Sequence, residues 1–135
     1  MKVVIDTNIL ISALIRDGIP ERVLLLCLRR PDVDWLVTQA IIDEYLEVIR
    51  RPKFALPDMI VARWNELLVA DTKMLQPNLP MDFPRDRKDA PFLACAASGS
   101  ADYLITGDRD FTDAQRLVPA RIISARGFAE EVMGG

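Results

Sequence analysis

The sequence predicts a single α/β domain built on a parallel β-sheet. Short β-branched segments alternate with longer amphipathic segments along the chain, and this alternation is typical of βαβ units whose sheet is covered on both faces. The length of 135 residues suits one domain, which we assign to residues 1–135. Half of the residues are hydrophobic, so the chain has enough apolar side chains to fill a core and is not expected to be disordered.

The first elements follow from the apolar spacing. Residues 2–5 form a β-branched run that predicts a buried strand, and the pattern over residues 7–15 predicts a helix directly after it. Gly18 and Pro20 interrupt that pattern, so a second helix is expected from about residue 20 to residue 30.

A strand at residues 35–37 is followed by Thr38, which is suited to cap a helix that extends to about Ile49. The remaining expected elements are a helix at 57–70, a strand at 74–76, a proline-rich loop at 77–87, a helix at 89–99, strands at 103–106 and 120–123, and a helix that ends near Met133.

Composition excludes several classes of site. The chain has no histidine, which rules out a Ser-His-Asp or Cys-His triad and a histidine-rich zinc site. Its two cysteines, Cys27 and Cys95, lie in apolar helical patterns, as expected of a protein in a reducing cytoplasm. No apolar run approaches the roughly 18 residues of a transmembrane helix. The net charge of −3 disfavours a purely electrostatic nucleic-acid binder.

Two carboxylates stand where an α/β sheet places its ligands. Asp6 directly follows the first strand, and Asp108 follows the strand at 103–106 after the turn at Gly107. Ligands of such sheets bind outside the carboxyl ends of the strands. Aspartate is also common in turns and at helix starts, so each residue alone has an ordinary structural explanation.

Two further acids lie on predicted helices. Asp89 stands at the start of a helix and heads its apolar stripe, although it is equally suited to cap that helix. Glu44 lies at the edge of a buried stripe formed by Ile41 and Val48. A parallel sheet would bring these four acids together. Clustered carboxylates repel one another unless a cation neutralises them, and an all-oxygen ligand set selects Mg²⁺ or Mn²⁺, which suits phosphate chemistry.

Four segments resemble motifs of the PIN domain family, and they occur in the family's order across essentially the whole chain. These segments are Asp6-Thr7-Asn8, residues 38–44, residues 86–93 and residues 101–111. Each motif is weak alone, but the four together are specific. The greatest resemblance is to VapC-like and stand-alone PIN-family toxins of toxin–antitoxin systems.

The resemblance implies a Rossmann-like, three-layer α/β/α sandwich with a short parallel sheet. It also implies a divalent-metal-dependent ribonuclease that hydrolyses RNA phosphodiester bonds with Mg²⁺ or Mn²⁺. Carried over motif by motif, Asp6, Glu44, Asp89 and Asp108 form the catalytic and metal-binding site, and Asp110 is an additional metal ligand. The expected partners are RNA, a cognate antitoxin protein and a second copy of the chain, in the cytoplasm and without a membrane.

Other interpretations remain open at this stage. A haloacid-dehalogenase-like phosphatase needs a second acid two residues after the first, where this chain has Asn8. A receiver-like domain needs a late lysine, but the last lysine, Lys88, precedes the strand at 103–106. The third alternative is a catalytically inactive PIN fold that binds RNA or protein. Thr7, Asn8 and Thr106 are polar neighbours of the acids that would orient water or a carboxylate.

Basic and aromatic residues also have two interpretations. Four basic residues lie near the acids in the sequence: Arg85, Arg87, Lys88 and Arg109. They would position the RNA backbone, or they belong to solvated loops. The aromatic side chains favour core packing over base stacking; they are Trp35, Trp64, Phe92 and Phe111.

Overall fold

The structure of the protein is a computed structural model, and it describes residues 1–77, 88–108 and 114–134. Five strands form one sheet in the order β3-β2-β1-β4-β5, and every pair of neighbours is parallel. The strands are β1 (Lys2–Ile5), β2 (Asp34–Val37), β3 (Lys73–Met74), β4 (Tyr103–Ile105) and β5 (Arg121–Ile123). The predicted parallel sheet is therefore confirmed.

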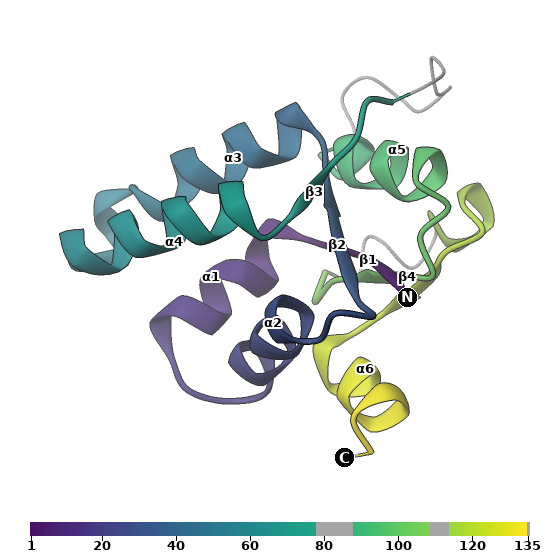
Figure 1. The fold of residues 1–135 in the computed structure, drawn as a ribbon, viewed down its shortest axis with the longest axis horizontal. Helices are drawn as coiled ribbons and strands as arrows, with labels where there is room; N and C mark the ends of the chain where they lie inside the picture. Colours follow the sequence, from purple (N-terminus) through teal and green to yellow (C-terminus); the bar gives the residue numbers. More distant parts are fainter. Residues whose placement is uncertain (78–87, 109–113, 135) are drawn as a thin grey trace.

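Helices cover the sheet on both faces, which confirms the three-layer α/β/α sandwich (Figure 1). The helices are α1 (Thr7–Ile15), α2 (Ile19–Arg29), α3 (Gln39–Ile49), α4 (Asp58–Ala70), α5 (Ala90–Ser98) and α6 (Ala125–Val132), with a 3-10 turn η1 (Pro52–Phe54). Helix α5 packs on β1, β2 and β4, whereas α1, α2 and α6 pack together on the other face. None of the described helices is long and apolar enough to cross a membrane.

Chain direction explains this division of the helices. From β1 to β2 to β3 the chain moves one way across the sheet, and from β3 it returns past β1 to β4. Parallel crossovers are right-handed, so a reversal of direction moves the connecting helix to the opposite face. Helix α5 is that connection.

The central strands are apolar because both of their faces are buried. Val3, Val4 and Ile5 of β1 are fully buried, as are Leu104 and Ile105 of β4. The core consequently runs through the middle of the sheet and leaves polar side chains to the strand ends.

Helix boundaries follow local signals. Thr38 caps α3 as predicted, because its Oγ1 accepts a hydrogen bond from the Ile41 N–H at 3.3 Å. Ser124 caps α6 in the same way, through the Gly127 N–H at 3.0 Å. The strand predicted at 74–76 instead spans Lys73–Met74, although the Leu75 N–H still donates to the Val37 carbonyl at 2.9 Å. Pro77 has no N–H to continue that ladder.

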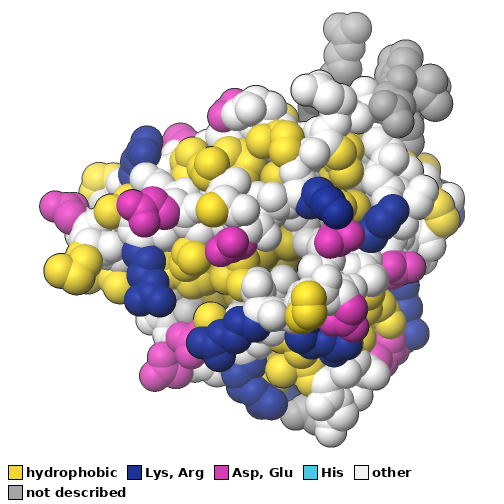
Figure 2. Space-filling view, viewed as in Figure 1, with side chains coloured by type: hydrophobic (Ala, Val, Ile, Leu, Met, Phe, Trp, Pro, Cys, Tyr) yellow, Lys and Arg dark blue, Asp and Glu magenta, His cyan; other side chains and the backbone are white. Residues whose placement is uncertain are grey.

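Helix α4 is the least buried of the long helices. Leu68 is its one fully buried side chain, while Met59 and Val69 are 82% and 66% exposed. Figure 2 shows hydrophobic side chains reaching the surface on the side of the molecule formed by α3 and α4. Acidic and basic side chains are interspersed on the same face, in line with the small net charge.

Candidate active site

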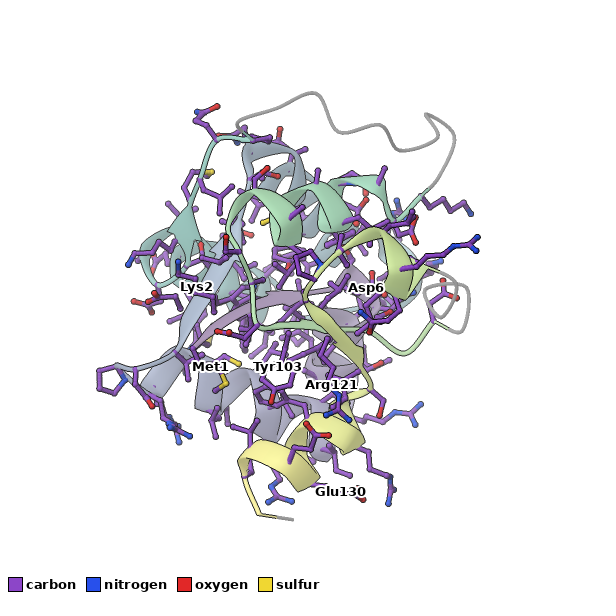
Figure 3. The ribbon with its side chains drawn as sticks, turned by 90° about the vertical axis from the view of Figure 1, so that its right-hand side faces the viewer. Met1, Lys2, Asp6, Tyr103, Arg121 and Glu130 are labelled. Carbon is purple, nitrogen blue, oxygen red and sulfur yellow. The ribbon has the colours of Figure 1, made fainter. Side chains whose placement is uncertain are left out.

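The strand order places the candidate site at the point where the sheet changes direction. The chain that follows β1 leads towards the β3 edge of the sheet, whereas the chain that follows β4 leads towards the β5 edge. Ligands of open α/β sheets bind in the crevice outside the carboxyl ends of such a pair of strands. Asp6 follows β1, and Thr106 and Asp108 follow β4. The two strand ends are joined by the Asp6 N–H, which donates to the Ile105 carbonyl at 2.9 Å. Figure 3 shows Lys2 and Asp6 at the two ends of β1.

Asp6 is a buried carboxylate with a specific partner. Its side chain is 6% exposed, and its Oδ2 accepts a hydrogen bond from the Thr106 hydroxyl at 2.9 Å. Asp6 occupies the N-cap position of α1 but forms no side-chain capping hydrogen bond. A helix cap alone therefore does not explain this acid, because its carboxylate is also bonded to the end of β4 through Thr106.

Thr106 connects two of the candidate acids. Besides donating to Asp6, its Oγ1 accepts a hydrogen bond from the Asp108 backbone N–H at 3.1 Å. Thr106 is itself buried, whereas Asp108 is exposed. One hydroxyl thus fixes the start of the chain segment that carries Asp108 relative to Asp6.

Glu44 reaches the same region from α3. Its neighbours Ile41 and Val48 are buried as predicted, and Glu44 is half-buried at the edge of this apolar stripe. The Thr7 hydroxyl, in the first turn of α1, donates a hydrogen bond to Glu44 Oε2. Each of the two threonines beside the site therefore holds one acid, a role that their sequence neighbourhood had suggested.

Two other acids lie near enough to Asp6 for their negative charges to act on its carboxylate. Burial is the largest cause that raises the pKa of Asp6 above its ordinary value of 3.8, and the negative charges of Glu44 and Asp108 raise this pKa further. The Thr106 hydrogen bond and the backbone N–H of Asn8 act in the opposite direction. A cation at this edge would relieve both the burial and the repulsion.

Asp89 precedes α5 and is 6% exposed. It occupies the N-cap position without a side-chain capping hydrogen bond. Because α5 connects parallel strands, its start lies at the carboxyl edge of the sheet, and the helix packs against β1 and α3, which lead to Asp6 and carry Glu44. Four of the five proposed site residues are therefore at this edge. Asp110 lies outside the described residues.

The donor chemistry suits a hard cation, but the geometry is not that of a complete metal site. Carboxylate and hydroxyl oxygens are the ligands that Mg²⁺ and Mn²⁺ prefer. Among the residues that the structure describes, no group of three or more Asp, Glu or Cys side chains is close enough to hold one ion. The acids are coupled through their charges without forming a closed coordination shell.

Several neighbouring side chains have structural roles. Trp35 and Phe92 are almost fully buried and are therefore not placed to stack on bases, whereas the partly buried Trp64 packs against the core. Arg51, at the end of α3, pairs with Glu47 at 2.8 Å. Of the basic residues expected near the acids, Lys88 is exposed, while Arg85, Arg87 and Arg109 lie outside the described residues, as does Phe111.

Comparison with known proteins agrees with this architecture. Residues 2–110 match the PIN domain family. VapBC-1 from nontypeable Haemophilus influenzae has a similar structure, with a TM-score of 0.60 and 22% identity over 93% of this chain and 99% of that chain. VapBC2 from Rickettsia felis, solved with a DNA fragment from its promoter, gives a TM-score of 0.59 and 13% identity over 92% of this chain and 98% of that chain.

No curated protein matches the sequence significantly. The family match covers most of the chain and contains Asp6, Glu44, Asp89 and Asp108. This chain therefore belongs to the PIN domain family.

Proposed function

We propose that this protein is a divalent-metal-dependent ribonuclease that hydrolyses RNA phosphodiester bonds. The observation that carries the proposal is the charge-coupled set Asp6, Glu44 and Asp108 at the switch point of a PIN-domain sheet, with Thr7 and Thr106 holding two of these acids. A buried acid such as Asp6 that is repelled by neighbouring acids destabilises a fold, and a cation-dependent activity gives a reason for this arrangement.

Asp6, Glu44, Asp89 and Asp108 would hold Mg²⁺ or Mn²⁺, with Asp110 as an additional ligand. Such an ion, when bound, polarises the phosphoryl group, activates water and stabilises the leaving oxygen. The chain itself supplies the preorganisation. Thr106 fixes the Asp6 carboxylate and the Asp108 backbone together, and Thr7 fixes Glu44, so part of the site is formed in advance, and the carboxylates would move closer together around the ion.

RNA would be recognised mainly by its backbone near the acids. Lys88 is exposed next to Asp89 and is a candidate phosphate contact. The face shown in Figure 2 carries mixed charges without a broad basic area, and the net charge of −3 disfavours RNA binding by electrostatic attraction alone.

The direct test is cleavage of a fluorescent RNA with Mg²⁺, with Mn²⁺ and with a chelator. Asp6→Asn and Asp108→Asn are expected to lower kcat at least about 100-fold, because the loss of a metal ligand removes several kcal/mol of transition-state stabilisation. Glu44→Gln should have a similar effect. Asp43→Asn is the matched control, since Asp43 is the neighbouring acid on α3, is exposed, and accepts a hydrogen bond from Gln39 at 2.8 Å.

Equal activity in wild type and Asp6→Asn would contradict the assignment and indicate a contaminating nuclease. The alternative function is a PIN fold that binds RNA or protein without cutting, and one observation favours it: the described acids do not form a closed metal site. RNA binding without cleavage at any divalent-ion concentration would select this alternative.

The same proposal includes a biological role as the toxin of a toxin–antitoxin pair in the cytoplasm. Both of the solved structures compared above are of VapBC, and we expect this chain to bind an antitoxin protein and to form a homodimer. Expression of the free protein should arrest growth, and Asp6→Asn should abolish that effect. Normal growth at high levels of folded wild-type protein would contradict the toxin role, and sedimentation measurements test the dimer.

A further inference from the structure

Tyr45 is a fully buried polar side chain that the acidic site does not include. It follows Glu44 on α3 and is 0% exposed. Its hydroxyl donates a hydrogen bond to the Ile5 carbonyl and accepts one from Trp35 Nε1 at 3.3 Å. The Tyr45 ring packs edge-on against the Trp35 ring, with ring centroids 6.0 Å apart. It also packs in a tilted arrangement against the Phe92 ring, with ring centroids 6.5 Å apart. Tyr45 therefore joins α3, β2 and α5 to the end of β1.

The Ile5 carbonyl needs this partner because of how β1 pairs. The pairing of β1 with β2 covers Lys2 and Val3, whereas its pairing with β4 continues to Ile5. The Asp6 N–H points to β4, where it donates to the Ile105 carbonyl. In a planar trans peptide the C=O points opposite to the N–H, so the Ile5 carbonyl points towards the side where the β2 ladder has already ended.

The peptide between Ile5 and Asp6 is consequently held from both sides, by the Ile105 carbonyl and by the Tyr45 hydroxyl. This peptide sets the backbone position of Asp6. The residue before Tyr45 is Glu44, whose carboxylate is bonded to Thr7, the residue after Asp6. Two hydrogen bonds thus connect adjacent residues of α3 to residues on either side of Asp6.

We propose that Tyr45 is a positioning residue whose hydroxyl fixes the Ile5–Asp6 peptide and thereby sets the spacing between Asp6 and Glu44. The expected effect of Tyr45 on RNA cleavage rests on the proposed nuclease function. Its effect on the backbone position of Asp6 does not. The competing explanation is that Tyr45 is an ordinary core residue whose hydroxyl contributes stability alone.

Tyr45→Phe is the test, because it removes the hydroxyl and keeps the packed ring. Tyr103→Phe is the chemically matched control: Tyr103 is the other tyrosine of the chain, lies at the start of β4, and packs its ring on Phe128 with centroids 5.2 Å apart. Ile49→Val, a buried position on α3, controls for a general loss of stability in the same helix. All measurements are made well below the melting temperature of each variant.

For Tyr45→Phe we expect kcat for RNA cleavage to fall about tenfold or more with KM unchanged, since a small misplacement of reacting groups has effects of this size. Both controls should retain the wild-type kcat. Amide hydrogen exchange by NMR gives a readout without RNA or metal: the Asp6 amide should exchange at least about tenfold faster, beyond any change at the buried amides of β4.

Unchanged kcat together with an exchange increase that is uniform across the chain would overturn the proposal and leave Tyr45 as a core residue. The two proposals fail in different ways. If wild type does not cleave RNA, the nuclease function fails, while a selective increase in Asp6 exchange still supports positioning and its absence still refutes it.

Discussion

Asp6 shows how a single residue reports on the site. Its carboxylate is buried, receives one hydrogen bond from Thr106 and lies within the field of two other acids. Burial and repulsion disfavour the charged form more than the hydrogen bond favours it, so the pKa of Asp6 is above its ordinary value. A group with a raised carboxyl pKa costs stability at neutral pH, which a structural cap would not.

The stability of the protein should consequently depend on the charge of Asp6. The folded state keeps the Asp6 proton at pH values where the unfolded chain, with its ordinary pKa of 3.8, has already released it. The stability that this bound proton contributes is fully present below pH 3.8 and is lost as the pH rises through the folded-state pKa. Asp6→Asn removes the titration while keeping the shape. We expect its melting temperature to exceed that of wild type at pH 7, with a difference that shrinks towards pH 4.

Thermal unfolding at several pH values measures this difference, with Asp43→Asn as the exposed control. Addition of Mn²⁺ at pH 7 should raise the melting temperature of wild type and not that of Asp6→Asn, because an ion that binds the folded state stabilises it. A melting temperature of Asp6→Asn below that of wild type at pH 7 would show that the Asp6 carboxylate is stabilising, contrary to this account.

At the scale of elements, α3 links the sheet to the site. It begins at Gln39, is capped by Thr38 directly after β2, and carries Glu44 and Tyr45, which bond to residues on either side of Asp6. The cap determines where the helix starts and therefore which of its residues face β1. A change in this start would displace both side chains together.

Thr38→Ala should lower the free energy of unfolding by about 1 kcal/mol, the usual effect of losing an N-cap hydrogen bond. Thr38→Ser should retain most of the stability because it keeps the accepting oxygen. Urea denaturation measures these values, and Ser124→Ala, which removes the cap of α6 far from the acids, gives the comparison. A stability of Thr38→Ala equal to that of wild type would show that the cap does not set the start of α3.

At the scale of the whole molecule, the two thiols report on opening of the core. Cys27 and Cys95 are both free and buried, and burial raises the pKa of each to about 12. Thiolates are the reactive form, so the native protein should react with a thiol reagent at pH 7.5 far more slowly than the chain in urea. Native rates that match those of the unfolded chain would mean that the core opens locally.

The sequence alone was sufficient for the class of fold and for most of its elements, because these depend on local spacing. The β-branched run before Asp6 predicted β1, Thr38 predicted the start of α3, and the strand-end rule placed Asp6 and Asp108 together. The short β3 begins one residue earlier and ends two residues earlier than predicted, because pairing with β2, rather than its own weak pattern, decides which residues join the sheet.

Contacts between distant residues were decided by tertiary structure. Nothing near Tyr45 in the sequence indicates that its hydroxyl bonds to the Ile5 carbonyl, 40 residues away. The Thr106 bond to Asp6 spans 100 residues. Periodicity fixes which side of a helix or strand is buried, but the partner of a buried polar atom depends on how the elements pack, and that is a property of the folded chain as a whole.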